Sequence, residues 1–286
     1  MIASAIFPRE RVTVVGVLNA TPDSFSDGGR WVDERGAVDV DAAVDFAAQM
    51  VEAGAQMIDV GGESTRPGAT EVPMALEIDR TAPIVEALAK RFAVEISIDT
   101  RKAGVAEAAL DAGARVVNDV SGLSFDAALA EIAANAGASL IVGHARGTPE
   151  TMQQDPHFDD VLAEVATELG VSLAAARAAG IPDERLAVDP GIGFGKRLED
   201  NLALLANAGS LGETLGLPVL VGPSRKRFLG SLTGDPLECR DAATAAACAV
   251  AIFAGADAVR VHDVAGAVRA AAVAGALRKA RRGAAA

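Results

Sequence analysis

Hydrophobic residues fall along this chain in short, nearly uninterrupted runs that alternate with longer stretches of helical spacing. Short apolar runs rich in Val, Ile and Leu are typical of parallel strands that are buried on both faces. The stretches between them place apolar residues at helical intervals, as at Val40, Val44, Ala47 and Val51. The pattern predicts eight strands, at residues 13–18, 57–60, 95–98, 115–117, 139–142, 186–188, 219–221 and 258–260.

This alternation of strands and helices predicts a closed barrel of the α/β class. Glycines follow several predicted helices, where a left-handed residue commonly ends a helix. These are Gly54, Gly113, Gly137, Gly180 and Gly255. Eight near-even units without a break in composition predict a single (β/α)8 TIM barrel, for which 286 residues is a usual length. We expect one domain over residues 1–286 with a core from about 12 to 280; a doubly wound open sheet is the alternative.

Two connections, after the first and second predicted strands, are long. They cover residues 19 to about 36 and 61 to about 72, and loops of this length in a compact domain are usually functional or disordered. Both combine Gly, Pro and Ser with charged residues, among them Asp27 and Arg66. We expect two mobile loops over an active site.

Polar or glycine-rich groups stand at every predicted strand end, after almost wholly apolar strand interiors. They are Asn19, Gly61 to Glu63, Asp99, Asn118 with Asp119, His144, Asp189, Ser224 to Lys226, and Arg260 with His262. In TIM barrels the carboxyl ends of the strands carry the active site. The pattern therefore favours a catalytic face over a purely structural barrel.

The carboxylates at these ends have two interpretations, because Asp also forms turns and caps helices. For Asp119 and Asp263 both interpretations stay open. Asp99 and Asp189 end strands near the barrel axis, and Pro190 holds Asp189 in extended geometry. We expect these two to point into a cleft and to meet hydrogen-bond donors or a developing cation.

Cationic residues follow the same strand ends on a chain whose net charge is −13. They are Arg66, Arg101, Arg225, Lys226, Arg260 and His262. Isolated surface cations are usually solvated, but a cluster at one face predicts binding of phosphate or carboxylate. The alternation of Arg260 and His262 places both side chains on one side of an extended segment, which suits a shared anionic ligand.

Composition and motifs exclude several other functions. The acidic charge argues against nucleic acid, and the uncharged stretch 242–256 is too short for a membrane span and predicts a buried helix. Two cysteines and no signal-peptide pattern predict a cytoplasmic protein.

Residues 191–196 lack the spacing of a phosphate loop, Ser224 is not in a nucleophile elbow, and no histidine pair has zinc spacing. Electrostatic catalysis fits better, with Mg²⁺ held by an oxygen ligand such as Asn19.

Seven segments, spread in order over nearly the whole chain, carry a family resemblance. They are GVLNATPDSFSDGG (16–29), IDVGGESTRPGA (58–69), SIDT (97–100), NDVSG (118–122), DPGIGFGK (189–196), SRKRFLG (224–230) and VRVHDV (259–264). In these the chain resembles the dihydropteroate synthases, the folate-pathway enzymes that sulfonamides block. The resemblance implies transfer of a pterin from 6-hydroxymethyl-7,8-dihydropterin diphosphate to para-aminobenzoate, with release of pyrophosphate and a requirement for Mg²⁺.

The resemblance also implies a role for each matching residue. Asp99, Asn118, Asp189 and Lys226 would hold the pterin, and Asn19, Arg260 and His262 would bind the diphosphate, with Asn19 also meeting the metal. Thr65, Arg66, Phe194 and Ser224 would form the aminobenzoate site, and Phe25 and Asp27 would close over the reacting centre. The family is usually homodimeric, and the apolar helix at 242–256 is a candidate for that interface.

The chain departs from the family pattern at Gly143, where Met is common, at Ala145, and at Pro223. The glycine predicts a looser pterin pocket.

Two other functions are weighed against the synthase. A methyltetrahydrofolate:corrinoid methyltransferase-like barrel should lack the Ser224 to Lys226 run and the Thr65–Arg66 loop, and a non-catalytic pterin-binding paralogue would keep the pocket without turnover.

Overall fold

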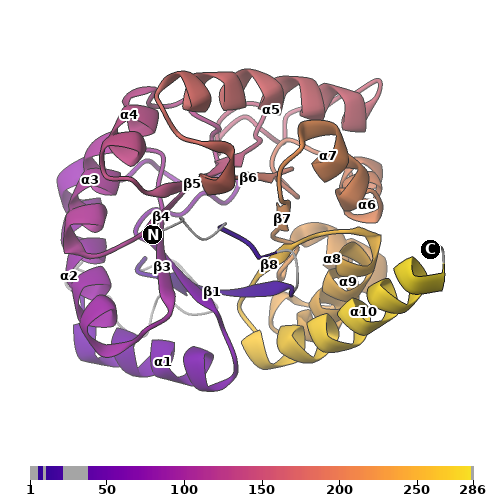
Figure 1. Cartoon of the computed structure of the whole chain (residues 1–286), viewed down its shortest axis with the longest axis horizontal. Coiled ribbons are helices and arrows are strands. Elements are labelled where there is room, and N and C mark those ends of the chain that lie inside the picture. The colour runs from indigo at the N-terminus through magenta and orange to yellow at the C-terminus, as the bar shows by residue number, and fades with distance from the viewer. Residues whose placement is uncertain (1–5, 9–10, 22–37, 285–286) are drawn as a thin grey trace.

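The computed structural model describes residues 6–8, 11–21 and 38–284, and these form a barrel of parallel strands inside a ring of helices (Figure 1). The strands follow the order β6-β5-β4-β3-β2-β1-β8-β7 in one eight-stranded sheet. Their bounds are β1 Thr13–Asn19, β2 Met57–Gly61, β3 Glu95–Asp99, β4 Val116–Asp119, β5 Ser139–Gly143, β6 Leu186–Asp189, β7 Leu220–Val221 and β8 Ala258–Val261. All eight predicted strands are present, and most extend one residue further toward the carboxyl end.

The seam between β6 and β7 decides between a closed barrel and an open sheet. Val188 forms a parallel bridge with Val219, and its amide donates to the Pro218 carbonyl over 3.0 Å. These contacts close the sheet on itself. The prediction of a (β/α)8 barrel is confirmed, and the open-sheet alternative is wrong.

Helices connect successive strands and form the outer ring in Figure 1. Their bounds are α1 Val40–Glu52, α2 Met74–Arg91, α3 Ala103–Ala112, α4 Ala128–Asn135, α5 Val161–Ala178, α6 Leu198–Ala206, α7 Ala208–Leu215, α8 Arg227–Thr233, α9 Asp241–Ala254 and α10 Val264–Ala284, with short 3-10 turns at Asp183–Arg185 and Leu237–Cys239. All five glycines predicted to end helices have positive φ. They supply the left-handed conformation that residues with a Cβ adopt at a cost.

Each strand sends alternate side chains to opposite sides of the sheet, which creates two cores. Outward-facing residues such as Ile58 and Val60 pack under the helices. Inward-facing residues such as Met57 and Ile141 form a separate small cluster inside the barrel, closed at its amino-terminal end by Phe7. The lower interior is therefore apolar and filled.

The same alternation makes the upper interior polar. The strand register aligns Asn19 with Gly61, Gly61 with Asp99, and Asp99 with Asn118. On the far side, Gly143 aligns with Asp189. Asn19, Asp99, Asn118 and Asp189 therefore stand at or next to the carboxyl ends of their strands, on the side of the sheet that faces the axis.

Three long connections follow strands at this end of the barrel, and the sequence predicts two of them. Residues 62–73 join β2 to α2 as expected, whereas most of the first predicted loop, with Phe25 and Asp27, lies outside the described residues. The structure adds a long connection that the sequence reading missed, residues 144–160 after β5. Its contact with the second loop is a hydrogen bond from the Gly68 amide to the Pro149 carbonyl, 2.9 Å.

The apolar stretch 242–256 forms most of α9, but the prediction of a buried helix is only half right. Cys248 and Ile252 are buried against the barrel, while Val250 and Phe253 on the other face are exposed. Among the described helices, none is both long and apolar enough to cross a membrane.

Candidate active site

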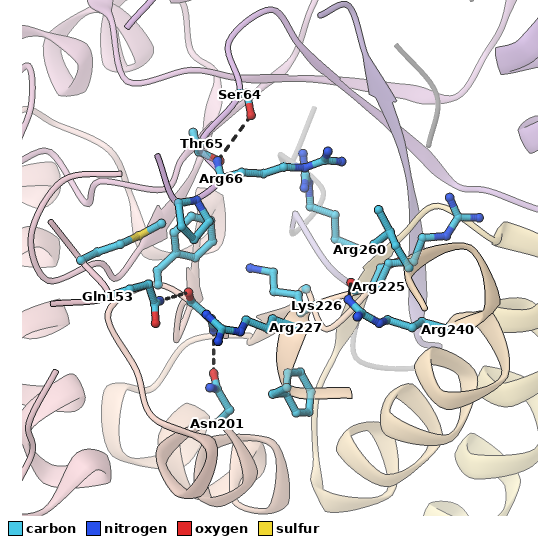
Figure 2. Close-up of a pocket in the computed structure, with 18 of the residues that line it drawn as sticks. Ser64, Thr65, Arg66, Gln153, Asn201, Arg225, Lys226, Arg227, Arg240 and Arg260 are labelled. Carbon is cyan, nitrogen blue, oxygen red and sulfur yellow. Dashed lines mark hydrogen bonds between the residues drawn. The ribbon is translucent and has the colours of Figure 1, made fainter. Parts of the chain in front are cut away.

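A cavity of about 670 Å³ opens at the carboxyl ends of the strands, and most of the predicted site residues line it (Figure 2). They are Asn19, Thr65, Arg66, Asp99, Phe194, Ser224, Lys226, Arg260 and His262. Met152, Gln153 and Pro156 of the β5–α5 connection complete one wall. Asn118 and Asp189, also predicted, are buried beside the cavity at the ends of β4 and β6.

The floor of the cavity is built around the guanidinium of Arg260. Its Nε donates to Asp59 Oδ2 over 2.5 Å, and its terminal nitrogen donates to Asp99 Oδ2 over 2.6 Å. Asn118 Nδ2 donates to the same Asp59 oxygen over 3.0 Å. One cation from β8 thus joins carboxylates from β2 and β3, and the amide of β4 completes the group.

Asp59 is a member of this group that the sequence reading missed. It lies in the middle of β2, its side chain is almost fully buried, and it faces the barrel axis. The prediction of site residues rests on polar groups at strand ends, and Asp59 is not at an end. The available signal was a charged residue inside an otherwise apolar strand, which is costly unless it is paired.

Three acceptor oxygens of this group make no hydrogen bond within the described part of the chain. They are Asp59 Oδ1, Asp99 Oδ1 and Asn118 Oδ1, and each is shielded from solvent. Buried acceptors without partners are rare in folded proteins, and their cost is repaid when a ligand supplies donors. The floor is therefore suited to a molecule with several N–H groups along one edge.

Burial also alters the protonation of Asp99. It raises the pKa of this carboxyl above its ordinary value, Arg260 opposes the rise, and the nearby charge of Asp59 adds to it. An acid of this kind takes up a proton more readily than an exposed aspartate does. A bound cation, or a cationic transition state, would favour its ionised form.

Asp189 and Lys226 face this group from the other side of the barrel. Burial raises the pKa of Asp189, while the Gly191 amide, which donates to Oδ1 over 2.7 Å, and Lys226 oppose the rise. Burial lowers the pKa of Lys226 to about 8, against the attraction of Asp189. The Lys226 ammonium donates to the Ile192 carbonyl and lies 3.9 Å from the centre of the Phe194 ring. Figure 2 shows this amine directed into the cavity.

Ser224 and His262 form a second group, at the ends of β7 and β8. The Ser224 hydroxyl accepts from the His262 backbone amide over 3.1 Å and lies 2.9 Å from the ring Nδ1. A hydroxyl that accepts from the amide can donate its own proton to Nδ1, and in that arrangement the ring proton of His262 lies on Nε2. Burial, together with the positive charges of Arg225, Arg260, Arg66 and Lys226, lowers the pKa of His262 to about 3. The neutral ring is thus prepared to donate to an anion.

Fewer of the predicted cations are available to the cavity than the sequence suggests. Arg66 reaches across the cavity toward Arg260 in Figure 2, in line with the prediction. Arg101 lies outside the cavity lining, because it pairs with Glu63 over 2.5 Å and stacks on Phe125. Arg225 lines the cavity but also holds Asp241 through two hydrogen bonds of 2.7 and 2.8 Å.

Three other strand-end residues have structural partners. Asp119 accepts from the amides of Ser121 and Leu123 over 2.8 and 2.6 Å, and Asp263 accepts from the Gly266 amide over 3.1 Å. Both contacts correspond to the turn and cap interpretations that the sequence left open. His144 is buried beneath the cavity between Glu168 and the amine of Lys196, and burial lowers its pKa to about 4.

Comparison with known proteins agrees with this arrangement. Residues 15–262 match the family model described as pterin binding enzyme. Dihydropteroate synthase from Synechocystis is 44% identical over 245 residues, which are 85% of this chain and 82% of that protein. The enzyme of the same name from Escherichia coli is 44% identical over 240 residues, 84% and 82% of the two chains. The chain belongs to the dihydropteroate synthase family.

Solved structures of family members share the fold closely. Dihydropteroate synthase of Yersinia pestis in complex with a sulfonamide drug has a TM-score of 0.90 at 41% identity, covering 98% of this chain and all of that one. The Xanthomonas albilineans enzyme, solved with 4-aminobenzoic acid, has a TM-score of 0.84 at 44% identity over 94% and 93% of the two chains. Membership of this family makes the chain a transferase and disfavours the corrinoid methyltransferase alternative.

The departure from the family pattern at Gly143 has a packing explanation. A Cβ on this residue would lie 2.6 Å from the Cα of Val120 and 2.7 Å from the carbonyl oxygen of Asp119. The end of β5 thus packs directly on the turn that follows β4. The absence of a side chain here allows that approach, and its effect on pterin affinity stays a prediction.

Replacement of Gly143 by Ala should destabilise the protein. The added methyl meets backbone atoms, which cannot rotate away, so we expect the free energy of unfolding to fall by about 1–3 kcal/mol in a urea titration. Gly170→Ala is the matched control, because Gly170 lies within α5 and a Cβ there meets nothing within 4 Å. Equal stability of the two variants would contradict the packing explanation.

Proposed function

We propose that this chain condenses 6-hydroxymethyl-7,8-dihydropterin diphosphate with para-aminobenzoate, giving 7,8-dihydropteroate and pyrophosphate. One observation carries the proposal. Buried acceptors without partners among the described residues lie at the floor of a cavity, and cations suited to a diphosphate line the same cavity. A substrate that has N–H groups at one end and a diphosphate at the other matches this division. Family membership supports the same activity.

The pterin is assigned to the floor of the cavity. Its amino-pyrimidinone edge presents N–H donors, which suit the free oxygens of Asp99 and Asn118 and the carboxylate of Asp189. Its ring carbonyl suits the ammonium of Lys226. Each buried polar group that pairs in this way avoids the cost of an unmet hydrogen bond.

The diphosphate is assigned to Arg260, His262 and Asn19. Arg260 offers a planar donor pair, and the Nε2 hydrogen of His262 provides a neutral donor beside it. Mg²⁺ suits this position, because magnesium is commonly held by one or two protein oxygens together with substrate phosphates, and the Asn19 amide oxygen is of the required type. Among the described residues, no group of three or more His, Cys, Asp or Glu is arranged to hold a metal ion, so a cage built wholly of such side chains is not offered there. When bound, the ion would neutralise charge on the leaving pyrophosphate.

The aminobenzoate is assigned to the outer cavity, between Thr65 and Arg66 on one side and Phe194 and Ser224 on the other. Phe194 offers an aromatic face, and Arg66 offers a partner for the carboxylate. Closure over the reacting centre is proposed for Phe25 and Asp27, on the strength of the motif 16–29 alone. The relative from Xanthomonas albilineans was solved with 4-aminobenzoic acid.

The reaction needs no covalent intermediate with the protein. The arylamine nitrogen bonds to the pterin methylene carbon, the bond from that carbon to the diphosphate oxygen breaks, and the amine loses a proton. Positive charge that develops on the pterin is stabilised by the carboxylate of Asp99, and Arg260 and His262 stabilise the charge of the departing pyrophosphate. Since an arylamine is already nucleophilic, an activated Ser or Cys is not required.

The test is turnover with a matched inactive variant. Purified protein with pterin diphosphate, para-aminobenzoate and Mg²⁺ is expected to form dihydropteroate and pyrophosphate in equal amounts. Asp99→Asn is expected to lower kcat/KM at least about 100-fold, because the electrostatic stabilisation of the cation is lost. Pyrophosphate release that is independent of aminobenzoate, without dihydropteroate, would identify a pterin-binding paralogue and sink the proposal.

The same variant should remain folded. Because the folded-state pKa of Asp99 is raised, its ionised form costs stability at pH values above that pKa, and Asn cannot ionise. We expect the Tm of Asp99→Asn at pH 8 to equal or exceed that of the wild type, with the difference shrinking as the pH falls and Asp99 takes up a proton. A lower Tm at pH 8 would contradict this sign.

We also propose that the protein is a cytoplasmic homodimer. Cys239 and Cys248 are free thiols, which suits a reducing compartment. An exposed apolar face runs over α9 and α10, where the Arg281 guanidinium lies on the Phe253 ring. Val273 and Leu277 precede Arg281 at helical intervals on the same side of α10. Contiguous exposed apolar surface of this kind commonly marks a subunit interface.

Sedimentation velocity tests the dimer. The wild type should sediment as a dimer, and Val273→Glu should shift the population toward monomer, because a charge would be buried at the interface. Val171→Glu, at a strongly exposed valine on α5, is the matched control and should leave the dimer intact. A wild-type monomer at micromolar concentration would refute the homodimer.

A further inference from the structure

The loop between β2 and α2, which carries Thr65 and Arg66, is closed at its base by an ion cluster outside the cavity floor. Glu63 lies near the start of the loop, which covers residues 62–73, and Val72 lies near its end. Glu63 Oε2 accepts from the Val72 backbone amide over 2.7 Å. Lys102 Nζ donates both to that carboxylate oxygen and to the Val72 carbonyl, each over 2.6 Å. One carboxylate and one ammonium thus hold the two ends of the loop together.

Lys102 is bound from three directions. Its third hydrogen bond goes to Glu77 Oε2 on α2, again 2.6 Å, so all three ammonium hydrogens are used. Glu77 Oε1 in turn accepts from the Thr100 hydroxyl over 2.7 Å. The side chains of Lys102, Glu63 and Glu77 are all more than nine-tenths buried. Loss of the ammonium would therefore leave three acceptors at the loop base without this donor.

The cluster pairs two acidic side chains with two basic ones; burial raises the pKa of Glu77, and the hydrogen bonds from Lys102 and Thr100 oppose the rise. Two carboxylates, Glu63 and Glu77, face two cations, Arg101 and Lys102. Burial raises the pKa of Glu63, but Lys102, the Val72 amide and Arg101 together bring it below its ordinary value, so the group is ionised. Ion pairs that are this buried are poor sources of stability compared with apolar packing, so a specific positional role is the natural reason for them.

The tip of the loop is more exposed than its base. Beyond the clamped ends, its hydrogen bonds among the described residues include one from Gly68 to Pro149 and one from Ala69 to Arg66. Arg66 to Gly68 are exposed, and Thr65 is half-buried. The direction in which Thr65 and Arg66 face the cavity, seen in Figure 2, therefore depends on where the base of the loop is held.

We propose that Lys102 is a positioning residue for the second substrate: its ammonium fixes the base of the loop so that Thr65 and Arg66 face the aminobenzoate end of the cavity. This inference rests on the proposed function for the identity of that substrate. Lys102 lies outside the cavity lining and touches no proposed pterin group, so its loss should affect the two substrates unequally.

The first test is a kinetic comparison of Lys102→Met with wild type. Methionine keeps the length of the side chain and removes the three hydrogen bonds. We expect KM for para-aminobenzoate to rise about 10- to 100-fold, and the Kd of pterin diphosphate, measured by calorimetry, to change less than about threefold. Lys90→Met is the matched control, because Lys90 is exposed at the end of α2 and pairs only locally with Glu86.

A charge-balanced variant protects this test against simple misfolding. Lys102→Met alone leaves Glu77 buried without its cation, whereas Glu77→Gln combined with Lys102→Met removes one charge of each sign. The double variant should fold and still show the raised KM for aminobenzoate. Equal losses of affinity for both substrates, with a lowered Tm, would assign Lys102 a general structural role and overturn the proposal.

A second measurement needs no catalysis. Glu71 is exposed just before Val72, so a glutamate-specific protease reports opening of the loop base. Cleavage after Glu71, identified by mass spectrometry, should be about tenfold faster in the double variant than in Lys90→Met. Unchanged cleavage with unchanged KM overturns the inference. Absence of dihydropteroate synthesis by the wild type overturns the proposed function instead, and the cleavage rates then decide the role of Lys102 alone.

Discussion

The site depends on one buried guanidinium shared by two carboxylates. Asp59 and Asp99 lie on neighbouring strands, and without Arg260 between them their charges would repel in a region from which solvent is largely excluded. Arg260 holds both, yet each carboxylate keeps one oxygen that has no partner in the described part of the chain. A cation that is shared in this way leaves acceptors for a donor-rich ligand, and the guanidinium has further N–H groups that can donate to an anion. The geometry of the floor thus leaves some hydrogen-bond acceptors unpaired, and a bound substrate can supply the missing donors.

The barrel explains why such a group can exist at all. Parallel strands buried on both faces send alternate residues to the axis. Met57 therefore lies in the small apolar cluster inside the barrel, and Asp59, two residues later, lies in the site. The apolar layer below supports the charged layer above and keeps water from it. Because the ends of neighbouring strands align in register, carboxylates from β3 and β6 reach one cavity although 90 residues separate Asp99 from Asp189.

The periodicity of the sequence predicted all eight strands and the face that carries the site, because strand spacing and polar ends are local signals. What it missed was decided by pairing in space. Arg101 looked like a member of the anion site, yet Glu63 draws it away from the cavity. Asp59 was not predicted as a site residue, because its partner, Arg260, is 201 residues distant in the chain. Local patterns give the direction in which a side chain points, whereas its partner depends on the register of the whole sheet.

The segment from Asp99 to Lys102 shows how the two substrate positions are linked. Asp99 faces the cavity floor, Thr100 and Lys102 face the loop cluster, and only two residues separate the outer pair. A displacement of the backbone of this segment would strain hydrogen bonds of 2.6 Å on both sides, whereas loss of the Lys102 side chain alone removes contacts of the loop base only. The pterin floor and the base of the aminobenzoate loop are therefore held in one geometry. In a displacement reaction, whose rate depends on the alignment of nucleophile, carbon and leaving group, such shared support favours catalysis directly.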